Sequence, residues 1–436
     1  MKMIRLPLLF VLMGALLLPT LAAQKTPAPT PTQSNTWIDA ATGHRVIRLT
    51  SQPESSAWYF NNNVFTSDGQ MIYDVLDPAM GGYAIYALNL TTFQSKQLVA
   101  APTWSGVVAH KSPFVYFTRP KDTGIYSVNT GTGVIAKIGE RPPRAEINTI
   151  NADDTLLAGT YTEVEPPQHP DDKTLNPSQN KAKGMVNRLN DHVPMTLFTV
   201  NVETGKVTPI LHSTDWLNHP NFSPTDPTLL MYSHEGPWEQ VDRIWTIRAD
   251  GSDNKLIHQR TVNGEIAGHE FWDADGKTIW YDLQIPRGQN FYLASYNTET
   301  KARRWYAMGR DDWSIHFNVN NNGLFFCGSG AGEGNISRSK NARWINLYLP
   351  VLSPPAPGID QSKLVQSGHL ETQHLVSMAK QLYLDEPNVR FSPDQNWVIF
   401  NADFTGPSYI YAVEIAKGTP VTPTAPPSTP TPAGGK

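Results

Sequence analysis

The sequence predicts an all-β fold, and within that class a seven-bladed β-propeller. The first observation is a pattern that recurs seven times: a turn with Asp or Gly, a short strand of alternating apolar residues, and a second strand that ends in a polar turn. The second is the spacing of these repeats, about 40 to 70 residues, which suits blades that carry long loops. The third is that no segment sustains the periodicity of an amphipathic helix. Four-stranded blades around a central channel satisfy all three observations, and a pair of β-sandwiches is the alternative.

The N-terminus has the features of a secretory signal peptide. Lys2 and Arg5 form a basic start, an apolar run extends from Leu6 to Leu18, and small residues end at Ala23. We therefore expect residues 1–23 to be cleaved and the protein to be exported to the periplasm or secreted; a retained anchor is the alternative. No other stretch is apolar for the roughly 18 residues that a membrane helix needs, so no membrane span is expected after cleavage.

Pro- and Thr-rich segments flank the repeats. Residues 24–35 and 418–436 contain almost nothing that a core could bury, so we expect a disordered linker and a disordered tail around a propeller of residues 36–417. The single cysteine, Cys327, excludes an intramolecular disulfide, and its strand context predicts burial. The net charge of −4, with no dense basic patch, argues against nucleic acid as a partner.

Each repeat is built from turn and strand signals. The Asp68–Gly69 and Asp275–Gly276 steps supply the positive φ that hairpin turns need, and alternation such as Ile279 and Tyr281 fits half-buried strands. The strand-like segment His44–Thr50, upstream of the first repeat, is expected to complete the last blade and close the ring. The repeats begin at Phe65, Ala109, Ile150, Phe222, Trp272, Val319 and Phe391.

Two insertions interrupt the repeats. The segments Glu163–Pro194 and Gly330–Arg343 are long and polar. Loops of this length in a compact fold are usually functional or disordered. Sites in propellers tend to lie at one mouth of the channel, where loops from many blades converge.

Several classes of catalysis lack their motifs. The closest match to a nucleophile elbow, GSGAG from Gly328 to Gly332, does not place a serine in that motif, and no helix is expected after it. Cys327 is expected to be buried and therefore inert. The sequence contains no phosphate-binding loop and no dinucleotide-binding fingerprint.

Four of the 12 histidines stand near the ends of predicted innermost strands: His219, His234, His269 and His316. They could face the same mouth of the channel, because innermost strands surround it. Neutral imidazole is both a metal ligand and a base near neutral pH. The residues alone therefore indicate a propeller with either a histidine-based site or four packed, hydrogen-bonded histidines.

At these residues the sequence resembles the oligogalacturonate lyase family. The resemblance covers most of the propeller and is clearest from Trp216 to Glu414. Its strongest segments are LNHPNFSPTDPTLLMYSHEGPWEQVDRIW, from Leu217 to Trp245, and GHEFWDADG, from Gly268 to Gly276. It implies a seven-bladed propeller that cleaves short α-1,4-linked oligogalacturonides, or related uronic-acid oligosaccharides, by β-elimination and leaves a 4,5-unsaturated uronate. The enzyme would be a carbon–oxygen lyase acting on polysaccharides.

The resemblance also implies roles for single residues. His234 matches the base of the family, and His269 matches its histidine ligand. Glu386 and Asn388 occupy two positions of the last blade where better-known members carry histidine, so carboxylate and amide oxygens would bind the metal there. His316 is then expected to supply a further nitrogen donor. The implied cofactor is a divalent metal, Mn²⁺ or Ca²⁺, which neutralises charge on the substrate carboxylate.

Binding of the acidic oligosaccharide needs further groups. No arginine aligns with the catalytic arginine of the family, so Arg188 and Arg243 are both candidates for a bidentate contact with a carboxylate. His219 and Trp238 are expected to contribute to the same substrate-binding surface. The alternative is an exported propeller without catalytic activity, which binds a glycan or a partner protein and holds no metal.

Overall fold

The computed structural model describes residues 35–104, 106–330, 339–355, 357–358, 360, 364–382 and 386–417. These residues form one compact unit. The predicted signal peptide, nearly all of the predicted linker and the predicted tail lie outside the described residues, as does part of the second insertion. Among the described residues are 29 strands, one α-helix and one short 3-10 helix, so the all-β prediction is confirmed. No described helix is long and apolar enough to cross a membrane.

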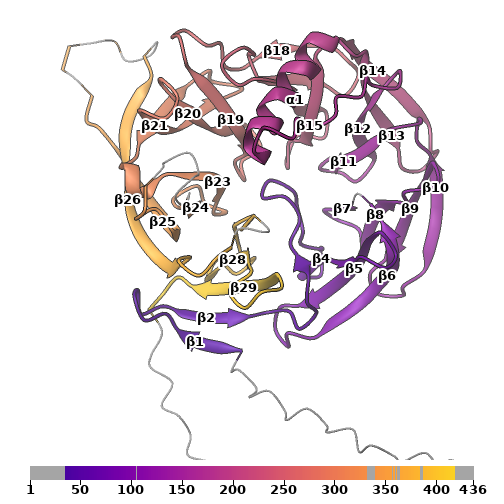
Figure 1. Ribbon diagram of the computed structural model, residues 1–436, viewed down its shortest axis with the longest axis horizontal. Helices are drawn as coiled ribbons and strands as arrows, with labels where there is room; N and C mark the ends of the chain where they lie inside the picture. Colours follow the sequence, from indigo (N-terminus) through magenta and orange to yellow (C-terminus); the bar gives the residue numbers. More distant parts are fainter. Residues whose placement is uncertain are drawn as a thin grey trace, which may run out of the picture. The chain divides into compact units, whose positions relative to one another are not determined.

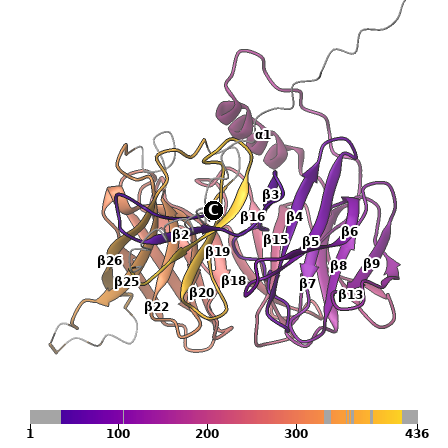
Figure 2. The same cartoon turned by 90° about the horizontal axis from the view of Figure 1, so that it is seen from below.

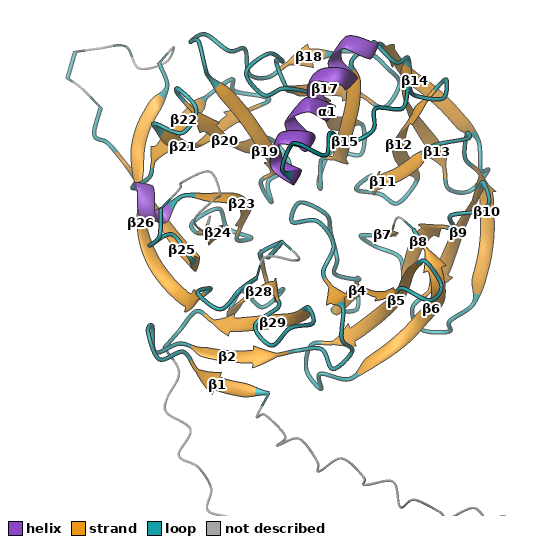
Figure 3. Cartoon of the chain, viewed as in Figure 1, coloured by secondary structure: helices purple, strands orange, loops and turns teal. Residues whose placement is uncertain are grey.

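The strands form sheets that follow one another around a ring in chain order (Figures 1 and 3). One four-stranded sheet comprises β3 (Ser55–Ser56), β4 (Gln70–Asp77), β5 (Gly82–Asn89) and β6 (Ser95–Thr103). The next comprises β7 (Gly106–Val108), β8 (Phe114–Thr118), β9 (Gly124–Asn129) and β10 (Ile135–Glu140). The third comprises β11 (Glu146–Ile150), β12 (Leu156–Thr162), β13 (Met195–Asn201) and β14 (Val207–Ser213). The fourth comprises β15 (Trp216–Phe222), β16 (Leu229–Glu235), β17 (Ile244–Arg248) and β18 (Lys255–Leu256).

The next sheet has eight strands and consists of two antiparallel halves. The first half comprises β19 (Ile266–Trp272), β20 (Thr278–Gln284), β21 (Phe291–Asn297) and β22 (Arg303–Ala307). The second comprises β23 (Ser314–Val319), β24 (Phe326–Gly330), β25 (Trp344–Leu352) and β26 (Gln366–Ser377). Only the outer strands β22 and β26 join the halves, by a parallel pairing in which Arg304 lies opposite Gln366. The 3-10 helix Arg310–Asp312 connects the two halves along the chain.

The last sheet joins the two ends of the described chain. It comprises β27 (Arg390–Phe391), β28 (Trp397–Ala402), β29 (Tyr409–Glu414), β2 (Arg45–Arg48) and β1 (Thr36–Ile38). Val46 of β2 pairs with Val413 of β29, so the prediction that His44–Thr50 completes the last repeat is confirmed. Apolar side chains pack between neighbouring sheets, and Cys327 is fully buried among them, also as predicted.

The expectation that the chain has no helix is wrong for one segment. Helix α1 (Pro177–Asp191) lies within the first insertion, and Figure 2 shows it at one end of the strands. Its apolar side chains are few, which is why hydrophobic periodicity did not reveal it. Local signals start and end it instead: Asn176 and Gln179 form a reciprocal capping box, and His192 adopts the left-handed conformation at the C-terminus.

Candidate functional site

Bulges in the innermost strands bring chemically useful side chains together. Because extra residues in one strand redirect the side chains they carry, bulges are common next to active sites. His219 and His269 have left-handed backbones, with φ of 48° and 49°, which is unusual for a residue other than glycine. The pairing register shifts between Ile147 and Thr149 in β11, Asn218 and Asn221 in β15, Gly268 and Phe271 in β19, and Ser314 and Phe317 in β23. These four bulges contain Asn148, His219, His269 and His316.

His269 and His316 are neighbours. Their ring centroids are 5.1 Å apart, and Nε2 of His316 lies 3.7 Å from Oε2 of Glu386. Asn388 is two residues from Glu386 and donates from Nδ2 to its backbone carbonyl at 3.2 Å. The structure therefore places His269 beside His316 and His316 beside Glu386, and it links Asn388 to this group through the Glu386 backbone.

Several polar atoms of His269, His316 and Asn388 have no hydrogen-bond partner among the described residues. Nδ1 of His269 lies 2.7 Å from Oδ1 of the buried Asp282, which leaves Nε2 as the free ring nitrogen. Nδ1 of His316 and Oδ1 of Asn388 are buried, and neither makes a hydrogen bond to any described residue. Leaving buried polar atoms unpaired costs free energy, so a bound group is expected to satisfy them.

Burial sets the protonation states of the two histidines in opposite ways. Burial lowers the pKa of His316 well below its ordinary value, and the neighbouring His269 and His219 act in the same direction. Burial also opposes protonation of His269, but the Asp282 carboxylate outweighs it and the pKa of His269 is raised. His316 is thus a neutral imidazole with a lone pair available to a cation.

His219 joins this group through aromatic contacts. Its ring stacks on Tyr59 with centroids 5.6 Å apart, and Tyr59 in turn contacts His316 at 5.1 Å. Nε2 of His219 lies 3.3 Å from Oε2 of Glu235. Burial opposes ionisation of Glu235, but Arg243 and His219 hold its pKa below the usual value. A charged carboxylate therefore orients the His219 ring.

Arg243 is committed to two buried carboxylates. It donates from Nε to Glu270 at 3.0 Å and from Nη1 to Glu235, and Ser233 also donates to Glu270. Arg243 and Glu270 are 7% and 1% exposed at their side chains, so the pair lies in the interior. This geometry assigns Arg243 to the support of Glu235 and His219, rather than to direct contact with a substrate.

His234 lies apart from the other three histidines. Its neighbours in β16, Ser233 and Glu235, both face the Arg243 and Glu270 network, and alternation places His234 on the opposite face of the strand. There its ring stacks on Trp245 at 4.6 Å, and Nδ1 is 3.6 Å from Oδ2 of Asp215. Burial lowers the pKa of His234.

The two remaining candidates, Arg188 and Trp238, also lie outside the histidine group. Arg188, near the end of α1, has its guanidinium carbon 5.9 Å from the ring centroid of Trp216, and its buried Nη1 has no hydrogen-bond partner among the described residues. Burial lowers the pKa of Arg188. Trp238 lies beneath the guanidinium of Arg287 at 4.9 Å, in the loop between β16 and β17.

The segment with Tyr59 and Phe60, which contacts the histidines from the centre of the ring, was not predicted from the sequence. Tyr59 and Phe60 lie between β3 and β4, and Phe60 stacks on His316 at 4.6 Å. The buried Arg390 holds this segment by donating to the backbone carbonyls of Trp58, Tyr59 and Asn62. The aromatic run AWYF before the first repeat was the available signal.

Asp282 was missed as well. It lies in the apolar strand TIWYDLQ, and a charged residue at a buried position requires a partner. That partner is His269.

The donor set suits a divalent cation that accepts both nitrogen and oxygen. Among the described residues, no three His, Cys, Asp or Glu side chains are placed to hold a metal ion by themselves. This includes His269, His316 and Glu386, so these three side chains would have to move closer together, with the Asn388 amide oxygen as a further donor, before they could share one cation. Mixed imidazole, carboxylate and amide ligation is compatible with Mn²⁺.

Comparisons with known sequences point to one family. A family model described as oligogalacturonate lyase matches residues 182–419, a range that includes all four histidines. The oligogalacturonate lyase of Dickeya dadantii is 24% identical over 418 residues, which cover 87% of this chain and 96% of that protein. The oligogalacturonide lyase of Pectobacterium atrosepticum is also 24% identical, over 88% of this chain and 97% of that protein.

Solved structures give the same result for the fold. An oligogalacturonate lyase in complex with manganese superposes with a TM-score of 0.71 at 22% identity, covering 88% of this chain and 96% of that one. The oligogalacturonate lyase from Vibrio parahaemolyticus gives the same values. At this identity the likeness establishes a shared fold.

Proposed function

Because this chain belongs to the oligogalacturonate lyase family, we propose that it cleaves short α-1,4-linked oligogalacturonides by metal-dependent β-elimination. The observation that supports the proposal is that His269 lies beside His316 and His316 beside Glu386, with two buried polar atoms, Nδ1 of His316 and Oδ1 of Asn388, that have no hydrogen-bond partner among the described residues. The proposed reaction removes the C5 proton, breaks the bond from C4 to the glycosidic oxygen and leaves a 4,5-unsaturated uronate.

The proposal includes a seven-bladed propeller as the scaffold. Its support is the topology of the described strands: four sheets of four strands, an eight-stranded sheet with two antiparallel halves, and a closing sheet of five strands. Each half of the eight-stranded sheet has the strand order of a single blade. We therefore assign one blade to each half.

His269, His316, Glu386 and Asn388 are the residues that would hold Mn²⁺. A divalent cation bound there would act as a Lewis acid on the substrate carboxylate next to C5. Asp282 fixes the ring of His269, and burial keeps His316 neutral. Burial favours a His316 imidazole that presents a lone pair, whereas the raised pKa of His269 means that a cation would compete there with a proton.

His219 is the base that the geometry supports. When Nε2 donates to the charged Glu235, Nδ1 carries the lone pair and can accept the C5 proton. Arg243 keeps Glu235 ionised and so acts as a positioning residue. His234, which the family resemblance favoured, faces the other side of β16, and we assign it a packing role.

Tyr59 is suited to protonate the leaving oxygen. It contacts both His219 and His316, and burial raises its pKa, so its hydroxyl remains protonated at neutral pH. A protonated hydroxyl in this position can supply the proton that the departing glycosidic oxygen needs.

The predicted signal peptide adds a location to the proposal. The basic start, apolar run and small residues at residues 1–23 support export to the periplasm or the medium. Immunoblots of periplasmic and cytoplasmic fractions, with and without residues 1–23, test this part independently.

The experiment for the reaction follows the ultraviolet absorbance of the conjugated product. Purified protein is incubated with digalacturonate or trigalacturonate and Mn²⁺, beside the variants His219→Ala and His234→Ala. We expect His219→Ala to lose about 10²–10⁴-fold in rate while it still binds Mn²⁺, because a general base contributes that much. His234→Ala, the matched control, should keep most of the activity.

Two results would contradict the proposal. Loss of activity in His234→Ala but not in His219→Ala would return the base to His234. A flat trace with every uronic-acid oligosaccharide, in protein shown to bind Mn²⁺, would remove the lyase and favour a propeller that only binds its glycan.

A further inference from the structure

A second cavity lies beyond the bulges, at the ends of the innermost strands. It has a volume of about 330 Å³ and is lined by the last residues of these strands, such as Ile150, Phe222 and Trp272, together with the turns that follow them. Helix α1 follows β12, which runs antiparallel to β11, so the helix lies at the opposite end of the strands. None of His219, His234, His269 and His316 lines this cavity, although Phe60, which does, stacks on His316. The size of the cavity falls within the roughly 300–1,000 Å³ typical of ligand pockets.

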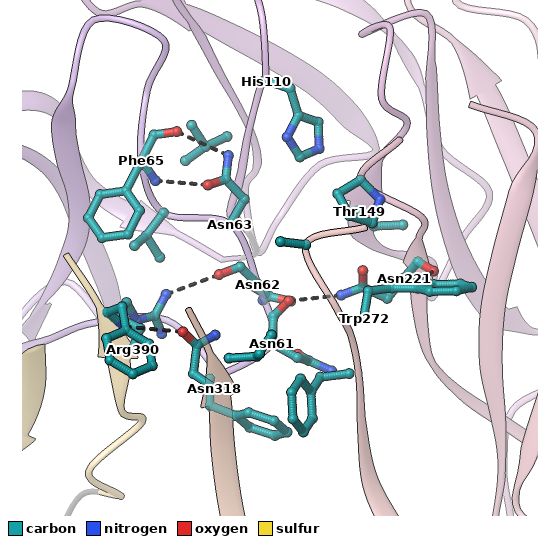
Figure 4. A pocket seen from close by; sticks show the side chains of 18 of the residues that line it. Asn61, Asn62, Asn63, Phe65, His110, Thr149, Asn221, Trp272, Asn318 and Arg390 are labelled. Carbon is teal, nitrogen blue, oxygen red and sulfur yellow. Dashed lines mark hydrogen bonds between the residues drawn. The ribbon is translucent and has the colours of Figure 1, made fainter. Parts of the chain in front are cut away.

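Carboxamides dominate the polar lining of this cavity. Seven asparagines and one glutamine contribute to the wall, together with the indole of Trp272 and the ring of Phe65 (Figure 4). Several of the amides also hold the wall itself in place: Asn221 donates from Nδ2 to the carbonyl of Asn61 at 3.1 Å, and Asn63 bonds twice to the backbone of Phe65.

The structural bonds leave both kinds of hydrogen-bonding atom for a ligand. Oδ1 of Asn318 accepts a hydrogen bond from the backbone N–H of Phe391 at 3.1 Å, so the NH₂ group of Asn318 remains available to donate to a ligand. Asn221 uses its NH₂ group on Asn61 and keeps Oδ1. Oδ1 of Asn148 is buried and accepts no hydrogen bond from the described residues. A ligand in this cavity thus meets donors and acceptors together, which matches hydroxyl groups, since each hydroxyl both donates and accepts.

The charged residues of the lining are already neutralised or engaged. The guanidinium of Arg390 donates to the carbonyls of Trp58, Tyr59 and Asn62. The Asp273 carboxylate accepts from the Trp280 indole at 2.8 Å. Burial lowers the pKa of His110, so this ring is neutral at neutral pH. Arg390 keeps its positive charge, because its partners are neutral carbonyls, but its N–H groups already donate to the protein. Among the described residues of the lining, the cavity thus offers an anion no uncommitted cationic group, in contrast to a site built for a uronate.

The wall also contains a fixed aromatic surface. The indole nitrogen of Trp272 donates to the carbonyl of Asn221 at 3.0 Å, which holds the ring against the β15 strand end. Apolar C–H groups pack well on such a ring, and aromatic side chains with a polar edge are common where a ligand is part apolar and part wet.

We propose that this cavity binds an uncharged polyhydroxylated molecule of the size of a neutral monosaccharide or disaccharide. The amides of Asn148, Asn221 and Asn318 bond its hydroxyl groups, and Trp272 packs against its C–H surface. The four histidines do not line this site, although Asn148 and Asn221 also line a smaller pocket with Tyr59 and His219. The site would hold a neutral sugar on a protein that, by the proposed function, acts on acidic ones.

Galactose and galacturonate provide a matched pair of probes, since they differ at C6, where galactose carries a hydroxymethyl group and galacturonate a carboxylate. Binding of each to the full-length protein is measured by isothermal titration and by ligand-observed NMR, with arabinose and rhamnose as further neutral sugars. The variants are Asn318→Asp, which converts the free NH₂ group to a charged oxygen, and Trp272→Leu, which removes the aromatic surface. Asn89→Asp is the control: Asn89 lies in an exposed turn between β5 and β6, accepts bonds from Thr91 and Thr92, and gains the same charge.

We expect saturable binding of a neutral sugar that weakens by roughly tenfold or more in Asn318→Asp, because a hydrogen-bond donor is replaced by a charged acceptor. Trp272→Leu should weaken it as well, and Asn89→Asp should leave it unchanged. Binding should persist in His269→Ala, which separates this site from the proposed lyase site. Absence of saturable binding by every neutral sugar overturns the proposal, and so does binding that is lost in His269→Ala or unaffected by both pocket variants. If Asn318→Asp fails to fold by its thermal melt, Trp272→Leu alone decides.

Discussion

Replacing Asp282 with asparagine is expected to weaken metal binding without removing a ligand. The Asp282 carboxylate is 2% exposed and lies 2.7 Å from Nδ1 of His269. An asparagine side chain has the same size as the aspartate side chain and can still accept a hydrogen bond through its amide oxygen. It removes the negative charge that raises the pKa of His269 and that holds Nδ1 of this ring, which leaves Nε2 as the nitrogen available to a metal.

The magnitude follows from the strength of this contact. A short hydrogen bond between an imidazole and a carboxylate is charge-assisted and about twice as strong as a neutral one. Loss of such an outer partner typically costs about 10–100-fold in metal affinity. That range corresponds to about 1.4–2.7 kcal/mol of binding free energy.

Titration of Mn²⁺ by calorimetry measures this loss directly, without any need for turnover. The control is Asp273→Asn: Asp273 is also a buried aspartate next to β19, but it accepts from the Trp280 indole and contacts no histidine. Asp282→Asn should lose affinity while Asp273→Asn keeps it. Equal affinity in Asp282→Asn and the parent protein would refute the argument that His269 is a ligand oriented by Asp282.

Three further predictions concern stability and order. Glu270→Gln should reduce the free energy of unfolding by about 3–5 kcal/mol, because it leaves the buried Arg243 with one charged partner; chemical denaturation measures this, and Glu299→Gln, in an exposed pair with Lys277, should show no measurable change. Burial raises the pKa of Asp74 from 3.8 to about 7, so the folded state keeps a proton that the unfolded state releases, and the free energy of unfolding should fall as pH rises between these values. Asp74→Asn should therefore be more stable than the parent protein by up to about 4 kcal/mol at about pH 8, and no more stable at a pH below 3.8. Denaturation curves at both pH values measure this difference. Arg390→Lys should release the segment from Trp58 to Asn62, because an ammonium group cannot span three carbonyls; limited proteolysis should then cleave there faster, whereas Arg45→Lys on the outer strand should leave the cleavage pattern unchanged.

Most of the fold could be predicted from local turn and strand signals in the sequence. The Asp–Gly turns and alternating strands predicted the all-β class, and His44–Thr50 was assigned to the last repeat because it resembled an unpaired strand. Helix α1 was not predicted, because a capping box and a few contacts define it, rather than an apolar stripe. Hydrophobic periodicity detects an apolar stripe but does not detect a capping box.

The histidine group was predictable as a set but not in its geometry. His219, His269 and His316 were recognised by their place near the ends of innermost strands, and the metal-ligand positions Glu386 and Asn388 by family resemblance. Which face of β16 His234 would occupy depends on strand register, and a shift of one residue exchanges the two faces. The left-handed bulges at His219 and His269 were not predicted, because histidine is enriched at positive φ but most histidines do not adopt it.

The pairing of β2 with β29 has a consequence for how the protein is made. The two strands that complete the last sheet come from opposite ends of the described chain, with Val46 beside Val413. A ribosome releases the first strand long before the second exists, so the ring remains open during nearly all of synthesis. Strand edges at the gap are then exposed to other chains, which is the condition under which β proteins aggregate. The contact between distant residues also adds a loop-closure cost that is met only after the last strand has been made.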